Sequence, residues 1–294
     1  EKYNIENGHF RTEKKMNNAQ IQDIEDLGIK LYENYYVEEV LTNGSTMRIF
    51  KNRDEVNKVC LMKGKMPEKP GEIGIDRMYA DNNDLSVGDE IESGGHTWKI
   101  TGLVALSDYS ALFSDNNDSM FDSVKFGVSV VCPEEFDSYK ADQLNYSYAW
   151  KYNTEPKNEK AEKDISEDLM EDVAKEVTLE EFVPRYTNQA IIFTGDDMGG
   201  DRSMMIVLLY IIIVIMAFVF AITTSNTIRK EANVIGTLRA SGYTRGELIR
   251  HYMAAPVFVT FIGAIIGNII GYTVGKDYCA GLYYGSYSLP TYVT

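Results

Sequence analysis

The side chains that most often carry out chemistry are few in this sequence and lie far apart. Its three cysteines are Cys60, Cys132 and Cys279, and they form no CxxC motif. They cannot all pair with one another, and a Cys60–Cys132 disulfide is conceivable, so the disulfide state of these two stays open. Only two of the three histidines precede residue 203, too few for a typical zinc site. We therefore expect no metal centre.

Familiar catalytic motifs are missing from the sequence as well. It contains no GxSxG, HExxH or GxxxxGK[ST], so we expect no hydrolase nucleophile, zinc protease or nucleotide-binding P-loop. SDNNDSMFD places Asp115, Asn117 and Asp118 near one another, but it lacks the glycine and final glutamate of a calcium loop. An exposed polar loop is the simpler interpretation. The sequence thus predicts no catalytic residue, no cofactor and no enzyme.

Three tyrosines could instead form a recognition surface. Tyr32, Tyr35 and Tyr36 lie close together in a β-rich stretch, and tyrosine is enriched at interfaces. Packing within a strand is the alternative for at least one of them.

Charge is distributed unevenly along the chain. The sequence has 29 basic and 44 acidic side chains, a net charge of -15. Residues 1–203 hold 23 basic and 41 acidic side chains, a net charge of -18, whereas residues 225–251 hold five and two, a net charge of +3. Because neutralising phosphates requires a basic face, the acidic part argues against a nucleic-acid partner.

Two uncharged stretches are long enough to cross a membrane. Residues 204–224 (MMIVLLYIIIVIMAFVFAITT) contain no charged side chain. At about 1.5 Å per residue, a helix of this length spans roughly 31 Å, the thickness of a bilayer core. A buried helix of a globular protein would show a polar stripe, and this stretch has none. Residues 252–275 are also uncharged, with Pro256 expected to bend the helix near its start.

The second stretch carries glycines at every fourth position, which places them on one helical face. Small residues let another helix approach closely in lipid, so this face is predicted to pack against a helix. Glycine is also common in membrane helices generally, but the regular spacing favours the packing interpretation. The four residues are Gly263, Gly267, Gly271 and Gly275.

Loop charge predicts the orientation in the membrane. Basic loops stay in the cytoplasm, so residues 225–251 are expected there, with residues 1–203 and the tail 276–294 outside. This topology describes a multi-pass protein of the cell membrane. Export of the first 203 residues needs a preceding signal or membrane helix, and none precedes Glu1, so we expect the chain to be a fragment of a longer protein.

Residues 1–203 mix helix and strand patterns and are predicted to form one α+β domain with its own core. Helices are expected over 17–27, capped by Asn17 or Asn18, and over 159–177. The Asn43-Gly44 pair predicts a hairpin with a type I′ turn, in which both residues have positive φ. Further elements are expected as a short strand and helix between Pro70 and Gly88, strands over 97–104 and 124–132, and a helix beginning at Pro133.

The basic loop is predicted to contain two helical pieces joined at Ser241-Gly242-Tyr243, and the second piece is expected to continue into the second membrane helix. Gly242 suits the left-handed conformation that ends a helix, and Thr244 with Glu247 forms a capping box that begins the next one. A basic amphipathic helix can also lie on anionic lipid, so membrane lipid is an alternative partner for the loop.

The loop sequence IRKEANVIGTLRASGYTRGELIRHYM has an Arg/Lys-Glu pair, then Ile-Gly, Leu-Arg, and a small residue followed by glycine. This pattern resembles the cytoplasmic loop of FtsX-like, or MacB-like, permeases of ABC transporters. A second segment, GEIGIDRMYADNNDLSVGDEIES followed by WKITGLV within residues 71–104, is similar to part of their extracytoplasmic domain. The resemblance implies a MacB-like periplasmic core of α+β type followed by transmembrane helices, although the first and closing membrane helices of a complete unit are missing. The loop positions that match the family are Glu231, Ile235, Gly236, Leu238, Arg239 and Gly242.

The resemblance also implies a function. In such permeases the loop is a coupling helix that docks on a separate cytoplasmic P-loop ATPase, and two permease units or halves pack as a dimer. ATP hydrolysis then moves the extracytoplasmic domain, which is called mechanotransmission. We therefore expect a permease subunit that exports or extracts an amphiphilic cargo such as a peptide, lipoprotein or lipid.

Two other functions are weighed against this one. The first is a mechanotransmission complex without transport, which regulates a cell-wall hydrolase or senses antimicrobial peptides through an extracytoplasmic protein or peptide partner. The second is a membrane-anchored binding domain without an ATPase. The capping box and the glycine break in the loop argue against the second.

Overall fold

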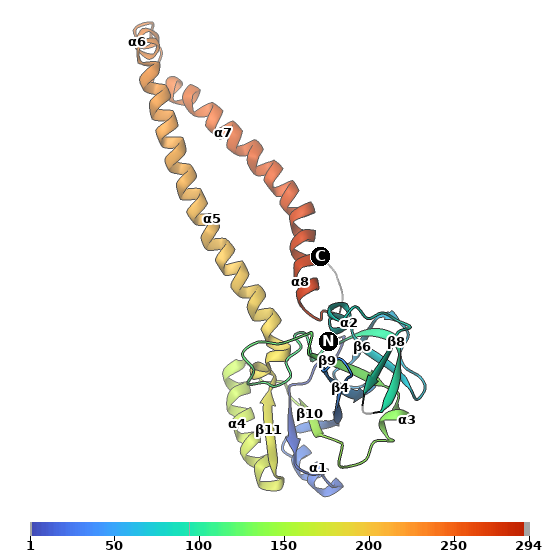
Figure 1. Cartoon of the computed structure of the whole chain (residues 1–294). Helices are drawn as coiled ribbons and strands as arrows, with labels where there is room; N and C mark the ends of the chain where they lie inside the picture. The colour runs from blue at the N-terminus through green and yellow to red at the C-terminus, as the bar shows by residue number, and fades with distance from the viewer. Residues whose placement is uncertain (1, 94, 291–294) are drawn as a thin grey trace. The chain divides into compact units, whose positions relative to one another are not determined.

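The computed structural model describes residues 2–93 and 95–290 and contains two compact units. The first unit comprises the chain up to residue 196 together with the residues from 282 onwards, and it contains both β-sheets. The second unit comprises residues 197–281 and is helical. Figure 1 labels the elements along the chain.

A four-stranded antiparallel sheet forms one half of the first unit. Its order is β11 (Leu179–Pro184), β1 (Gly8–Thr12), β10 (Tyr146–Tyr152) and β2 (Ile29–Glu33). Helices α1 (Asn18–Glu25) and α4 (Glu159–Glu176) contact each other and the outer strands of this sheet (Figure 1). Between these two helices and the sheet lies an aromatic core, in which the rings of Trp150 and Phe182 stack with centroids 4.7 Å apart.

The other half is a seven-stranded mixed sheet. Its main path is β3 (Tyr36–Val40), β4 (Thr46–Lys51), β9 (Phe126–Val131), β6 (Glu72–Asp76), β8 (His96–Leu106) and β5 (Val59–Gly64), while β7 (Glu90–Ser93) pairs with β8. The β4–β9 and β6–β8 pairs are parallel, and the others are antiparallel. Helix α2 (Arg77–Asn82) contacts β6, β8 and β9, and α3 (Pro133–Phe136) contacts β4. The central strand β9 is buried along its whole length, as expected for a strand covered on both faces.

Local sequence signals predicted several elements correctly. Asn17 caps α1 in a capping box with Gln20, Pro133 begins α3, and the Asn43-Gly44 hairpin joins β3 to β4. The predicted type I′ turn is wrong, because Gly44 has a φ of 81° whereas Asn43 does not have positive φ. The hydrogen bond from Leu41 N to Ser45 O closes a longer loop, so one left-handed residue is sufficient.

Three strands of the four-stranded sheet were not predicted, namely β1, β10 and β11. Strand β1 is short and begins with glycine, and β11 contains two adjacent glutamates, so neither has a strong strand pattern. Strand β10 does carry a signal, since aromatic side chains occupy every second position of YSYAWKY.

Long helices make up the second unit. After a 3₁₀ turn (Arg185–Thr187), helix α5 (Gln189–Lys230) begins in the first unit and continues without a break for 42 residues. Helix α6 (Ala232–Ala240) follows, and then α7 (Arg245–Ile270), a π-helical turn (Gly271–Gly275) and α8 (Lys276–Ser286). The predicted fold class, an α+β domain followed by long apolar helices, is confirmed.

Candidate functional site

Helix α6 is the short element between the two long helices, and it contains most of the predicted coupling residues. Helix α5 ends at Lys230, and Glu231 leaves the regular helical conformation with φ -97° and ψ 12°. The Glu231 carboxylate accepts a hydrogen bond from the Tyr252 hydroxyl at 2.5 Å. This contact ties the start of α6 to α7, and the sequence did not indicate it, because the two residues lie 21 positions apart.

The end of α6 is a glycine cap. Gly242 has a φ of 98°, the left-handed region that other residues enter only at a cost. Its N–H donates to Arg239 O, and the N–H of Tyr243 donates to Leu238 O, at 3.2 and 3.1 Å. These two bonds satisfy carbonyls that the helix end would otherwise leave unpaired, in the Schellman arrangement. The predicted helix end at Gly242 is confirmed.

A capping box begins α7, as the sequence predicted. The side chain of Thr244 accepts from the N–H of Glu247 at 3.3 Å, and the Glu247 carboxylate accepts from the N–H of Thr244 at 2.8 Å. The glycine cap and the capping box lie two residues apart, so the direction of the chain between α6 and α7 is defined by backbone hydrogen bonds. The loop is therefore built as a fixed helical element.

The side chains on α6 remain accessible. Gly236 and Arg239 are exposed, whereas Ile235 and Leu238 are half-buried and lie three positions apart on one helical face. Leu248, in the first turn of α7, is buried. Of the six matched loop positions, Glu231 is hydrogen-bonded to α7 and Gly242 ends α6. The other four lie on α6 itself.

The four predicted helix-packing glycines lie on α7 and the π-helical turn. Apart from the adjoining backbone of their own helix, Gly263, Gly267 and Gly271 have no described atom within 4 Å of the place where a β-carbon would stand, and at Gly275 the nearest such atom is Ile270 O at 3.7 Å. Packing of another helix on this face stays a prediction.

Helices α5 and α7–α8 have the properties of membrane-crossing helices. Each is long and apolar enough to span a bilayer, and no residue of its most apolar stretch is buried. Between Met204 and Ile222 almost every large apolar side chain is exposed. Contiguous apolar surface of this extent is rare on soluble monomers and marks contact with protein or membrane.

The polar loop after β8 has a structural use for its acidic residues. The carboxylate of Asp115 accepts from the N–H of Asn117 at 2.8 Å, and that of Asp118 accepts from the Ser114 hydroxyl at 2.7 Å. The three neighbouring tyrosines do not share one surface. Tyr35 is buried with its hydroxyl on Tyr148, Tyr36 lies under the Arg48 guanidinium, and Tyr32 lies beside Lys30. The three cysteines are all unpaired.

The first unit holds the start of α5 and the end of α8 through a cluster of residues that the sequence did not reveal. We call Asp76, Arg77, Ser110 and Ala111 the helix anchor. The start of α5 is held by Ala111 N, which donates to Ala190 O at 3.1 Å, and by the Ser110 hydroxyl, which donates to the same oxygen at 2.9 Å.

The end of α8 is held by the other half of the helix anchor. The Arg77 guanidinium donates to the carbonyl oxygens of Tyr284 and Tyr287, at 2.7 Å each, and the Ser288 hydroxyl donates to the Asp76 carboxylate. Around these bonds the rings of Phe113, Phe121, Phe193 and Tyr287 pack together.

A buried carboxylate is the most perturbed group of the helix anchor. Asp76 is fully buried, and this burial raises its pKa to about 6, although hydrogen bonds from Ser288 and from the N–H groups of Tyr79 and Met78 oppose the rise. Asp76 and Arg77 lie in the segment GEIGIDRMYADNNDLSVGDEIES that resembles the permease family, but the sequence did not indicate this role for them, since their partners are more than 200 residues away.

An α+β domain fastened to two exposed apolar helices defines this chain as a membrane protein. Residues 206–294 match the family model described as FtsX-like permease C-terminal. This part of the chain is therefore similar to the C-terminal part of FtsX-like permeases, and the resemblance predicted from the loop is confirmed. Permeases of this class are membrane components of ABC transporters that work with an ATPase, and they are not typical enzymes.

No curated protein sequence matched the chain. Among solved structures, the periplasmic region of MacB from Actinobacillus actinomycetemcomitans aligns with 11% identity and a TM-score of 0.32, covering 58% of this chain and 86% of that one. The extracellular domain of the noncanonic ABC-type transporter YknZ from Gram-positive bacteria aligns with 10% identity and a TM-score of 0.31, covering 59% and 100%.

Proposed function

We propose that the chain is a permease subunit that transmits ATP-driven movement from a cytoplasmic ATPase to its large domain outside the membrane. In this proposal residues 1–203 are extracytoplasmic, residues 204–224 and 252–275 cross the membrane, and residues 225–251 dock on the ATPase. The movement serves the export or extraction of an amphiphilic cargo such as a peptide, lipoprotein or lipid, and two such units work as a dimer.

The construction of the loop carries this proposal. A lipid-binding loop would need only charge and an apolar face. Here a break at Glu231, a glycine cap at Gly242 and a capping box at Thr244 hold a nine-residue helix in a defined position between two long helices. A rigid element with accessible side chains suits docking on a protein, because little ordering is needed on binding.

The helix anchor supports the second half of the proposal. Backbone and side-chain hydrogen bonds fasten the start of α5 and the end of α8 to one region of the large domain. A displacement of either helix end must therefore displace Asp76, Arg77, Ser110 and Ala111 or break these bonds.

The experiment compares stimulated ATP hydrolysis across loop variants. The intact chain is copurified with its ATPase and reconstituted in lipid. Leu238→Asp and Arg239→Glu alter side chains on α6 that make no long-range hydrogen bond or ion pair among the described residues. Each is expected to abolish the stimulation of ATP hydrolysis by the permease while the helical circular-dichroism signal stays unchanged.

Arg202→Glu provides the matched control, because it makes the same charge reversal at an exposed position of α5 outside the loop. This variant is expected to keep full stimulation. Normal stimulation in both α6 variants would refute docking through α6. A complex that contains no ATPase would refute the proposed function as a whole.

A further inference from the structure

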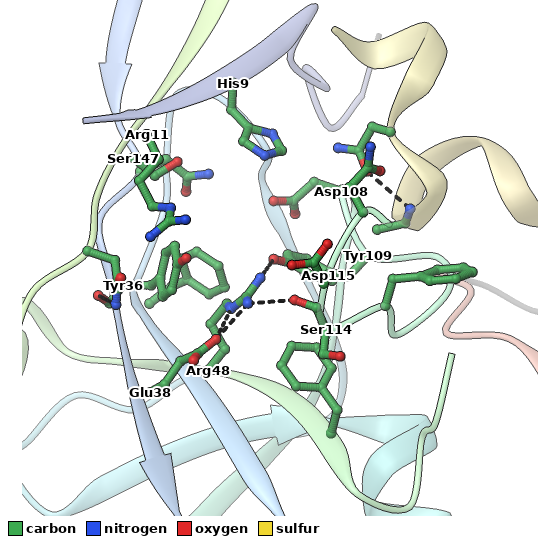
Figure 2. Close-up of a pocket in the computed structure, with 18 of the residues that line it drawn as sticks. His9, Arg11, Tyr36, Glu38, Arg48, Asp108, Tyr109, Ser114, Asp115 and Ser147 are labelled. Carbon is green, nitrogen blue, oxygen red and sulfur yellow. Dashed lines mark hydrogen bonds and ion pairs between the residues drawn. The ribbon is translucent and has the colours of Figure 1, made fainter. Parts of the chain in front are cut away.

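Asn34 lines two cavities of the first unit, and they differ in what they leave unpaired. One is a polar cleft of about 450 Å³, which Arg11 and Asp115 line (Figure 2). Arg11 is ion-paired with Glu180 and Glu181, at 2.8 and 3.6 Å, and the Asp115 carboxylate accepts from the backbone of its own loop. These charged groups stabilise the fold, and they leave little capacity for a ligand.

The other cavity is a groove of about 700 Å³ beside β2, which we call the β2 groove. Residues 31–35 and 51–56 line it, together with Lys15 and several side chains between positions 136 and 146. Its volume lies in the range of ligand sites. Part of the lining is apolar or aromatic, and this part includes Leu31, Val56, Phe136, Tyr139 and Leu144.

Strand β2 is the last strand of its sheet, and β10 is its partner there. In an antiparallel pair, the backbone groups of successive residues point alternately toward the partner strand and away from it. Asn34 N donates to Ser147 O of β10 at 2.9 Å, whereas Leu31 N donates to the Glu25 carboxylate, also at 2.9 Å. Leu31 and Glu33 therefore both direct their N–H and C=O groups away from β10.

Three of these outward groups form no hydrogen bond with another segment in the described part of the chain. They are the C=O of Leu31 and the N–H and C=O of Glu33. In chain order they present an acceptor, a donor and an acceptor at the spacing of a strand. Such an edge is a template for a second extended backbone, because that backbone repeats its own donors and acceptors at the same spacing.

Charged side chains around the β2 groove neutralise one another. Because their charges are already paired, an uncharged internal stretch of chain suits the groove better than a charged chain terminus. The basic side chains that line the groove each have an acidic partner: Lys15 pairs with Glu33, Lys51 with Asp137, and Arg53 with Asp108.

We propose that the β2 groove binds an uncharged internal segment of a partner polypeptide, which adds as a strand to the free edge of β2. Its N–H groups donate to Leu31 O and Glu33 O, and one of its carbonyls accepts from Glu33 N. Side chains alternate along the added strand, so one set lies against the apolar lining of the groove. A lipid chain would leave all three edge groups unpaired.

The test measures binding of capped peptides to the full chain in detergent by titration calorimetry. The probe is acetyl-Thr-Val-Tyr-Val-Thr-amide, which is uncharged and has a high β propensity. N-methylation of every second residue blocks one edge of the peptide and leaves the other free, whereas N-methylation of every residue blocks both edges. We expect saturable binding of the unmodified and the one-edge peptides, and weakening of about tenfold or more when both edges are blocked, because two hydrogen bonds are lost.

Two variants locate the binding at the edge of β2. Glu33→Pro removes the outward N–H and leaves the pairing with β10 intact, since proline is tolerated at such positions of edge strands. Glu33→Ala removes the same side chain and keeps the N–H. We expect the probe to bind Glu33→Pro about tenfold or more weakly than Glu33→Ala.

Hydrogen exchange of the wild-type chain tests the same contact without a substitution, in case Glu33→Pro lowers the melting temperature. Bound probe should slow exchange of the Glu33 amide, because that amide then has an acceptor. Amides of the central strand β9 should not change.

Four results would overturn the proposal: no saturable binding of the probe, equal affinity for the one-edge and fully methylated peptides, equal affinity in Glu33→Pro and Glu33→Ala, or no slowing at the Glu33 amide. A smaller particle mass of unliganded Glu33→Pro than of Glu33→Ala would show that the edge pairs with a second copy of the chain, and would also overturn it. The measurements require no ATPase, so their outcome is independent of the proposed permease function.

Discussion

Removing the Arg77 guanidinium should release the end of α8 from the large domain. Arg77 is 7% exposed, and its Nη2 donates to Tyr284 O and Tyr287 O at 2.7 Å each. The last carbonyls of a helix have no partners within the helix, and a cation placed there also interacts favourably with the helix dipole. The guanidinium carbon lies 4.0 Å from the centre of the Tyr284 ring.

The size of the effect follows from these contacts. Two hydrogen bonds from a charged donor contribute about 1.5–3 kcal/mol each, before the cost of burying the guanidinium is subtracted. The ring contact adds about 0.5–2 kcal/mol. A net loss of about 3 kcal/mol for Arg77→Ala corresponds to an increase of roughly 100-fold in the opening of this attachment.

Hydrogen–deuterium exchange of the full chain, followed by mass spectrometry, reports this opening directly. The N–H of Ser288, bonded to Ser110 O, should exchange about 100-fold faster in Arg77→Ala, because local opening limits its exchange. Amides of the central strand β9 should not change. Asp81→Asn serves as the control, since Asp81 is exposed and its ion pair with Arg77 is expected to contribute little.

Two outcomes would refute this reasoning. Unchanged exchange at residues 287–289 would show that Arg77 does not hold the end of α8. Equal acceleration across β9 and residues 287–289 would show that the substitution destabilises the whole domain, with no separate attachment.

Three further predictions concern single residues. Burial raises the pKa of Asp76 to about 6 from an ordinary 3.8, so its contribution to stability is largest below pH 4 and is lost as the pH rises through 6. Asp76→Asn keeps a good helix cap and should remove about 3 kcal/mol of the change in unfolding free energy between low and neutral pH. The same dependence of melting temperature on pH between pH 4 and 7 in the variant and the wild type would contradict this. Gly242→Ala should cost about 1 kcal/mol at a φ of 98°, seen as faster exchange of the Tyr243 amide, whereas Gly236→Ala within α6 should not accelerate it. Gly127→Ala would place its β-carbon 2.6 Å from the buried Tyr79 ring and should destabilise the domain by about 1–3 kcal/mol, while Gly199→Ala on α5 meets no neighbour and should leave the melting temperature unchanged or raised.

Local patterns determined much of the candidate site. The glycine at 242 and the Thr244–Glu247 pair act within a few residues, so they have the same effect wherever the loop lies in the molecule. The two apolar helices could likewise be predicted from composition, because crossing a bilayer requires only a long enough run of apolar residues. These features were therefore predicted correctly from the chain alone.

Contacts between distant segments were not predictable in this way. Strand β10 pairs with β1 over a separation of more than 130 residues, and the aromatic core that the two strands share stabilises this pairing. The hairpin turn was assigned the wrong type, because the dipeptide does not specify the length of the loop that closes around it.

By itself, the sequence determined where the chain can enter a membrane, where the short helix of the basic loop ends and the next helix begins, and which family it resembles. Tertiary structure alone decided that Arg77 holds the end of α8, and that Arg11 and Asp115 face one cleft. The physical reason is range. Helix caps and hydrophobic length act between neighbours along the chain, whereas the partners of a buried charge are chosen by the packing of the whole domain.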